Sequence, residues 1–346
     1  MTAAPARVRA ARASVRQGAV TVLVCALLAL VWLPDAYLLY QATLWMAAVI
    51  ALIGMVLLTG IAGQISLGQG AFVALGAYVG GMLLQHAAAL PGALGVALAG
   101  AVGFFAGGLL GYPALRWSGH LLALASFALA IAVPQLLKLP LLAGLTGGSQ
   151  GLVIDRAPPP AWLETVGIAG GLDAWVYGWT LIFTIGAVWL ARRVQRGPLG
   201  RAWGAARDHP LAAQSIGISI TRVRALAFAT AAALAAVSGA LQTWASGFLA
   251  PDSFPVFLSI SLLVGLVIGG VRSVGGTLIG AVFIQVLPTF LADLSTAAPW
   301  AVYGVLMILS VWLMPEGVAG RIHDGRRRVQ RSSSRGNHVG DPTNER

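Results

Sequence analysis

The sequence predicts an all-α polytopic membrane protein with about ten transmembrane helices, and three observations carry this prediction. Hydrophobic residues make up 58% of the 346 residues, only 10% are charged, and the mean hydropathy is +0.83. An average soluble domain carries roughly 25% charged residues. Apolar stretches recur from Val20 to Met314, and the basic residues gather in a few segments between them. Because a helix needs about 20 apolar residues to cross a bilayer, the chain is expected to cross it many times.

Ten spans are predicted from these stretches, separated by short polar or Gly/Pro-rich connections. They cover residues 18–33, 36–59, 67–86, 91–113, 120–141, 174–191, 225–246, 257–271, 275–293 and 299–315. The first is interpreted as a span rather than a cleaved signal peptide, because no A-x-A-like site follows it and a second apolar run begins at once. A membrane domain is therefore expected at 18–315, between a basic segment at 1–17 and a tail at 316–346.

The placement of the arginines predicts the orientation. Four precede the first apolar run, seven lie in 192–224 and seven in 321–346, so these segments hold most of the 22 basic residues. The positive-inside rule places them in the cytoplasm, with both termini, and leaves the 143–172 loop outside. This pattern indicates a multi-pass protein of a bacterial inner membrane, not a nucleic-acid binder. The polar 316–346 tail is expected to be disordered and to lie on anionic lipid.

A glycine-rich break interrupts the second and third spans at Thr59–Phe72. Glycines and uncharged polar side chains at membrane depth are costly in lipid, so this backbone must face protein or a water-filled path. Such interruptions are typical of a transporter's substrate site. The residues predicted to border a translocation pathway here are Gly60, Gly63, Gln64, Ser66, Gly68 and Gln69. For the later Gly76 and Gly80, close packing between helices is the alternative.

Two further segments are assigned to the same pathway. Gly269 and Gly270 begin a second glycine-rich break between the eighth and ninth spans, and Thr146 and Gly147 open the long external loop. Long ordered loops are often functional. The second and seventh spans run in opposite directions, so spans 2–5 and 7–10 are predicted as possible inverted four-helix repeats.

The basic loop at 192–224 is expected to contain a short helix. Pro210 suits its first position, with Asp208 or His209 as the cap, and Gly217 is able to end it in the left-handed conformation. Ala212 and Ala213 are expected on its surface, which suits docking into a groove on a cytoplasmic partner. The alternative is an interfacial helix that lies on the membrane.

Several absences narrow the class of function. Lys138 is the only lysine, so the sequence contains no G-x-x-x-x-G-K-[ST] phosphate loop, and any ATP must be hydrolysed by another polypeptide. The span interiors hold almost no ionisable residues, which disfavours an ion-coupled carrier. The five histidines are scattered along the chain and Cys25 is the only cysteine, so no metal site is predicted. The sequence shows no candidate for a buried nucleophile or for an acid–base pair, which disfavours a membrane enzyme.

Four motifs in order resemble the LivM-type permease of branched-chain amino acid ABC importers. They are Leu58–Phe72, Thr146–Gly148, Gly200–Ile218 and Gly269–Gly276, and the resemblance spans about residues 40 to 315. One departure is that family members commonly carry an acidic residue shortly before the alanine pair, where this chain has His209, Pro210 and Leu211.

The resemblance implies a heteromeric importer. Its other parts would be a second related permease, two cytoplasmic ATPases and an external solute-binding protein, and the 192–224 loop would carry the helix that docks on an ATPase. The residues assigned to that coupling are Arg201, Arg207, Ala212, Ala213 and Gly217. Leucine-type amino acids are the leading solutes, while urea, short amides or aromatic acids move through similar permeases.

Overall fold

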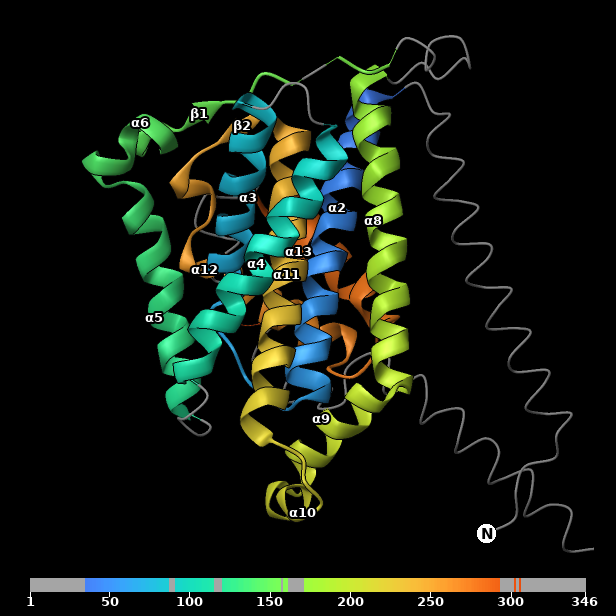
Figure 1. The fold of residues 1–346 in the computed structure, drawn as a ribbon. Coiled ribbons are helices and arrows are strands. Elements are labelled where there is room, and N and C mark those ends of the chain that lie inside the picture. The colour runs from blue at the N-terminus through green and yellow to red at the C-terminus, as the bar shows by residue number, and fades with distance from the viewer. Residues whose placement is uncertain are drawn as a thin grey trace, which may run out of the picture.

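The computed structural model describes residues 35–86, 91–114, 120–156, 158–160 and 171–292, together with Val302 and Val305. Within these ranges long helices form one bundle, with two short strands at one end (Figure 1). The longer elements are α2 (Ala36–Met55) continued by the π-helix η1 (Val56–Ile61), α3 (Gln69–His86), α4 (Gly92–Ala114), α5 (His120–Leu137), α8 (Gly171–Arg196), α9 (Pro198–Asp208), α11 (Ile220–Ser246), α12 (Val256–Gly269) and α13 (Gly276–Ala292). The short elements are η2 (Pro140–Leu142), α6 (Ala143–Thr146), η3 (Gly148–Gln150), β1 (Leu152–Val153), α10 (Pro210–Ser215), β2 (Phe248–Leu249) and η4 (Pro251–Ser253).

The all-α polytopic class is confirmed. The second to ninth predicted spans each coincide with a helix, whereas 1–17, the first span at 18–33, most of the tenth span at 299–315 and the 316–346 tail lie outside the described residues. In the described part, five helices are long and apolar enough to cross a membrane. A sixth is added if Leu121–Leu137 and Pro140–Thr146, bent by 61°, form one span. The total of about ten therefore stays a prediction.

The bend after α5 has a local cause. Pro140 disfavours the helical conformation in the residue before it, and Leu139 accordingly has ψ 135°. The chain then restarts as η2 with Pro140 in its first turn.

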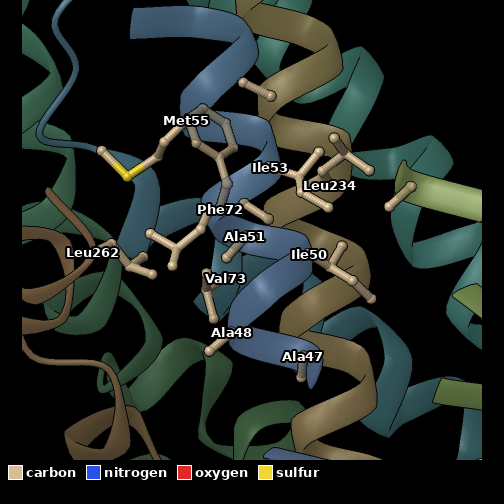
Figure 2. Packing of buried hydrophobic residues seen from close by; sticks show 14 of the residues in the cluster. Ala47, Ala48, Ile50, Ala51, Ile53, Met55, Phe72, Val73, Leu234 and Leu262 are labelled. Carbon is tan, nitrogen blue, oxygen red and sulfur yellow. The ribbon is translucent and has the colours of Figure 1, made fainter. Parts of the chain in front are cut away.

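The core lies where α11 packs on α2, α3 and α4 (Figure 1). Side chains around the whole circumference of α2 are buried between Met46 and Leu58, which is typical of a helix surrounded by others. Figure 2 shows part of this cluster, with Met55 of α2 beside Phe72 of α3 and Ile53 of α2 beside Leu234 of α11.

Small residues allow α3 and α11 to approach closely. A side chain at Gly76 would overlap the backbone of Ala236, and one at Gly239 would overlap the carbonyl of Val73. Gly80 lies against Ala240 in the same way. Of the two interpretations of Gly76 and Gly80, the contacts support helix packing.

The first long helix of each half of the bundle packs on helices of the other half. α11 packs on α3 and α4, while α2 packs on α12 and α13, and α2 and α11 lie antiparallel against each other (Figure 1). Two inverted repeats would produce this arrangement. The repeat itself stays a prediction.

Charged residues lie at the two ends of the described bundle. One end carries α9, α10 and the arginines of 193–224, and is called the arginine-rich end below (Figure 1). The other, the strand end, carries the antiparallel pair of β1 and β2. Ion pairs join Lys138 to Asp252 and Arg156 to Asp173 there.

Candidate functional site

The predicted first break is present and begins inside a helix. α2 changes into the π-helix η1, in which the Ala62 N–H donates to the Leu57 carbonyl at 3.1 Å, and regular helix is absent from residue 62 to residue 68. Gly63 has φ +69°, a conformation that glycine adopts without steric cost. The Thr59 hydroxyl donates to the Gln64 carbonyl at 3.1 Å and closes the turn. Short π-helical segments are frequent at functional sites.

The two glutamines of the break hold it against α11. The Gln64 side-chain amide donates to the Arg224 carbonyl at 3.2 Å, and that of Gln69 donates to the Ala231 carbonyl at 2.9 Å. Both side chains are buried. The Gln64 Oε1 is buried without a hydrogen-bond partner among the described residues. These polar groups therefore face protein, as their cost in lipid requires.

The remaining polar groups of the break contact α5. The Leu67 N–H donates to Ser126 Oγ at 2.9 Å, and the Gly68 N–H donates to Ser66 Oγ at 3.3 Å. A Cβ at Gly68 would lie 2.7 Å from the Ser126 carbonyl oxygen. The break is thus fixed from several sides.

The second predicted break is a tight turn that touches the first. α12 ends at Gly269, Gly270 has φ +102°, and α13 begins at Gly276. A side chain at Gly60 would overlap the carbonyl oxygen of Val271. The two glycine-rich segments, more than 200 residues apart in sequence, meet at the arginine-rich end.

The short helix predicted in the 192–224 loop is α10. It begins at Pro210, and Gly217 has φ +84°. The Gly217 N–H donates to the Gln214 carbonyl and the Ile218 N–H to the Ala213 carbonyl, both at 3.0 Å, which is the Schellman ending. His209, one of the two predicted caps, is the N-cap residue of α10, but its side chain makes no capping hydrogen bond, and the Asp208 carboxylate binds Arg207.

The prediction for the surface of α10 is half right. Ala212 is exposed, but only 2% of Ala213 is exposed, because it packs against Ala206 and Ile220. The exposed apolar side chains are Leu211 and Ile216, at 81% and 73%. Sequence reasoning missed them, although large apolar residues in an otherwise polar loop were a usable signal.

The loop also contains α9, which sequence reasoning missed. Its Trp203 is fully buried, and α9 packs on η1, α8 and α11. Arg201 is exposed on α9, whereas Arg207 at its end is partly buried. The Arg207 Nη1 donates to the Gly60 carbonyl at 2.8 Å, and its Nε donates to Asp208 Oδ1 at 2.8 Å.

Six residues thus converge at the arginine-rich end, and we call them the junction. They are Gly60, Gly63, Arg207, Asp208, Val271 and Arg272. The hydrogen bond from Arg207 is the largest effect and lowers the pKa of the Asp208 carboxyl. Desolvation opposes it, and the charges of Arg207, Arg272 and His209 also lower this pKa.

Thr146 and Gly147 lie at the strand end, away from the other predicted pathway residues. The buried Thr146 hydroxyl is 2.8 Å from the Leu137 carbonyl and accepts from the Gly148 N–H at 3.3 Å. Gly147, with φ +72°, ends α6. The pathway residues therefore form two groups. One runs from Gly60 at the arginine-rich end to Gln69 beside Ala231 in the middle of α11, and the other lies at the strand end. Their role in translocation stays a prediction.

The family relationship that these local features suggest extends over the sequence of nearly the whole bundle. The protein family described as "Branched-chain amino acid transport system / permease component" matches residues 37–311. The chain belongs to this family. The match covers both breaks, the 192–224 loop and every helix from α3 to α13, so the predicted resemblance to LivM-type permeases is confirmed.

Curated relatives agree with this family. The high-affinity branched-chain amino acid transport system permease protein LivM of Salmonella typhimurium is 31% identical over 293 residues, which cover 80% of this chain and 68% of that protein. LivM of Escherichia coli K12 is 30% identical with the same coverage. The permease protein LivH of Salmonella typhimurium is 27% identical and covers 78% of this chain and 90% of its own length. No solved structure matches the chain significantly.

Proposed function

We propose that the chain is the membrane-embedded permease subunit of an ATP-driven importer in a bacterial inner membrane, and that it moves branched-chain amino acids or similar small solutes. Membership of the permease family over residues 37–311 supports this function. The observation that carries the ATP-driven mechanism is α10, which projects from the arginine-rich end with Leu211 and Ile216 exposed (Figure 1). A protruding apolar surface on a charged end is suited to a protein partner.

The proposed assembly follows from what this chain lacks. Its sequence has no phosphate-binding loop, so two cytoplasmic ATPase subunits would supply the energy. A second, related permease would complete the membrane part, and an external solute-binding protein would deliver the solute. In this arrangement the chain has ten spans with both termini and the arginine-rich end in the cytoplasm, and spans 2–5 and 7–10 form inverted repeats.

The proposed mechanism is alternating access. The binding protein releases solute at the strand end, near Thr146 and Gly147. When ATP closes the two ATPases, α10 shifts and the spans tilt around the two glycine-rich breaks. Gly60 to Gln69, with Gly269 and Gly270, would border the passage or its moving walls. Selectivity would reside mainly in the binding protein, because few charged side chains occur within the spans.

The first experiment tests the assembly. The tagged chain is purified gently from its native membrane, the co-eluting chains are identified, and uptake of labelled leucine is measured in proteoliposomes with and without ATP inside. We expect two ATPases and a second permease to co-elute, and uptake to require both ATP and binding protein. Uptake by this chain alone, driven by an ion gradient, would contradict the proposal and support a secondary carrier.

A matched pair of variants tests the docking surface. The double variant Leu211→Ser and Ile216→Ser should lower the amount of co-eluting ATPase, because it removes the exposed apolar side chains of α10. The control is Leu141→Ser, which makes the same change at the strand end, where Leu141 is 92% exposed. Competition by urea, short amides and aromatic acids during uptake then identifies the solute class.

A further inference from the structure

Arg207 contacts a helix end rather than the surface where a partner would dock. The last carbonyls of a helix have no partner within the helix, and a cation is favourable at that end of the helix dipole. The Gly60 carbonyl belongs to η1, the end of the α2 segment, and it accepts the hydrogen bond from Arg207 Nη1. Arg207, which lies on α9, therefore binds the first break at the end of the α2 segment.

The guanidinium is held on both sides. Its Nη1 binds Gly60, while Nε and Nη2 lie 2.8 and 2.7 Å from Asp208 Oδ1. Only 22% of the Arg207 side chain is exposed. Its hydrogen bonds are thus made within this chain, in contrast to the exposed Arg201 earlier on α9.

The two glycines of the break provide the space for these contacts. A Cβ at Gly63 would overlap the Cγ of Arg207 and lie 3.2 Å from its Cβ, so the aliphatic stem of the arginine lies directly on this glycine. A Cβ at Gly60 would overlap the Val271 carbonyl oxygen instead. The first break therefore contacts the 192–224 loop at Gly63 and the second break at Gly60.

We propose that Arg207 is the positioning residue through which the 192–224 loop moves the first break, and that the junction moves as one rigid body. This inference rests on the proposed function, because it assigns the path by which displacement of α10 reaches the spans. Three segments distant in sequence touch within the junction, α9 through the Arg207 side chain and the two breaks through backbone, so displacement of α9 displaces Gly60 and, through it, Val271. Arg207 acts on the ATPases only through this chain.

The test compares uptake with ATP hydrolysis in the reconstituted complete importer. Arg207→Ala should leave the ATPases bound and active but lower the solute taken up per ATP by about tenfold, the factor expected for loss of a charge-assisted hydrogen bond. Arg207→Lys should lose less, since it keeps a cation at the helix end. Arg222→Ala, an exposed arginine at the same end, is the matched control and should keep the wild-type ratio.

A cysteine pair provides a test that does not depend on the alanine variant. The Cβ atoms at positions 63 and 207 would lie 3.2 Å apart, within reach of a disulfide, although a cysteine at position 63 takes up strain because the backbone there has φ +69°. Gly63→Cys and Arg207→Cys are introduced after Cys25, the only cysteine of the sequence, is replaced by serine. When reduced, this variant should be uncoupled like Arg207→Ala. When oxidised, it should regain most of its uptake per ATP, because the covalent bond replaces the lost contact.

Three results would overturn the inference. They are an unchanged uptake per ATP in Arg207→Ala, loss of the ATPases from that variant, and an oxidised cysteine pair that stays uncoupled or stops transport. The last result would mean that the loop and the break must move apart. Failure of the wild-type importer to take up solute with ATP would instead contradict the proposed function, so the two failures are distinguishable.

Discussion

The two glycine-rich breaks look alike in sequence and are stabilised in different ways. The first, at Thr59–Phe72, depends on other helices: Gln64 and Gln69 bind α11, Leu67 binds α5, and the Gly70 N–H donates to Ser259 Oγ of α12 at 2.9 Å. The second closes on itself. The Ser273 N–H donates to the Gly270 carbonyl at 2.9 Å, and the Gly276 N–H donates to the carbonyl and hydroxyl oxygens of Ser273.

Glycine has a different purpose in each break. On either side of the second turn, a side chain at Gly280 would overlap the Gly265 carbonyl, and one at Gly269 would overlap that of Gly276, so α12 and α13 form a close-packed hairpin. At the first break, glycines admit Arg207 and Val271. A segment held by separate partners is able to respond when one of them moves, whereas a self-closed hairpin moves as a unit. Four stability measurements test this difference.

Gly280→Ala should have the largest effect. Its methyl group meets backbone that has no room to shift, and overpacking of this kind costs about 1–3 kcal/mol of unfolding free energy. The control is Gly186→Ala on α8, where no atom lies near the added Cβ and helix propensity adds up to about 1 kcal/mol of stability. Thermal unfolding in detergent compares the two. Equal thermal unfolding midpoints for the two variants would show that close packing of α12 on α13 does not stabilise the second break.

Gln69→Met should come next and should act on the first break. It removes a buried hydrogen bond to Ala231 while nearly conserving side-chain volume, so we expect a loss of about 1 kcal/mol. Hydrogen exchange should also become faster at 62–68 and remain unchanged at 270–275. Faster exchange at both breaks would show that they are one cooperative unit and not two differently stabilised turns.

Ser273→Ala should have a smaller effect. The variant removes the hydroxyl acceptor of the Gly276 N–H, but the Ser273 carbonyl remains, and the turn is only partly buried. A loss of about 0.5 kcal/mol is expected in the same unfolding assay. A loss as large as that of Gly280→Ala would mean that the turn, and not the helix contact, stabilises the hairpin.

Gln64→Met should have the smallest effect, although Gln64 looks equivalent to Gln69 in sequence. Its Nε2 hydrogen bond is long, at 3.2 Å, and its Oε1 is buried without a partner among the described residues. Removing that oxygen offsets the lost hydrogen bond, so the unfolding free energy should change by less than about 0.5 kcal/mol. A loss equal to that of Gln69→Met would indicate that the oxygen has a partner in the membrane.

Local patterns were sufficient for much of the architecture. Long apolar stretches placed α2, α3, α4, α5, α8, α11, α12 and α13, because hydrophobicity and span length are properties of contiguous sequence. The Thr59–Phe72 break and the short helix that begins at Pro210 were also predictable, since proline restricts the backbone and glycine allows it more conformations where they occur. The sequence alone thus determined that the chain lies in a membrane, where its long helices run and where they break.

Only the tertiary structure decided which partner each polar group takes. Arg207 and Gly60 are 147 residues apart, and no periodicity relates them. The same holds for Ala213, which was expected on the surface and is buried because Ile220 folds back over it. Most of the long helices in the described part of the bundle are apolar around much of their circumference, so hydrophobic pattern does not specify which faces meet. That choice depends on how small residues allow backbones to approach, and this becomes visible only when the whole bundle is assembled.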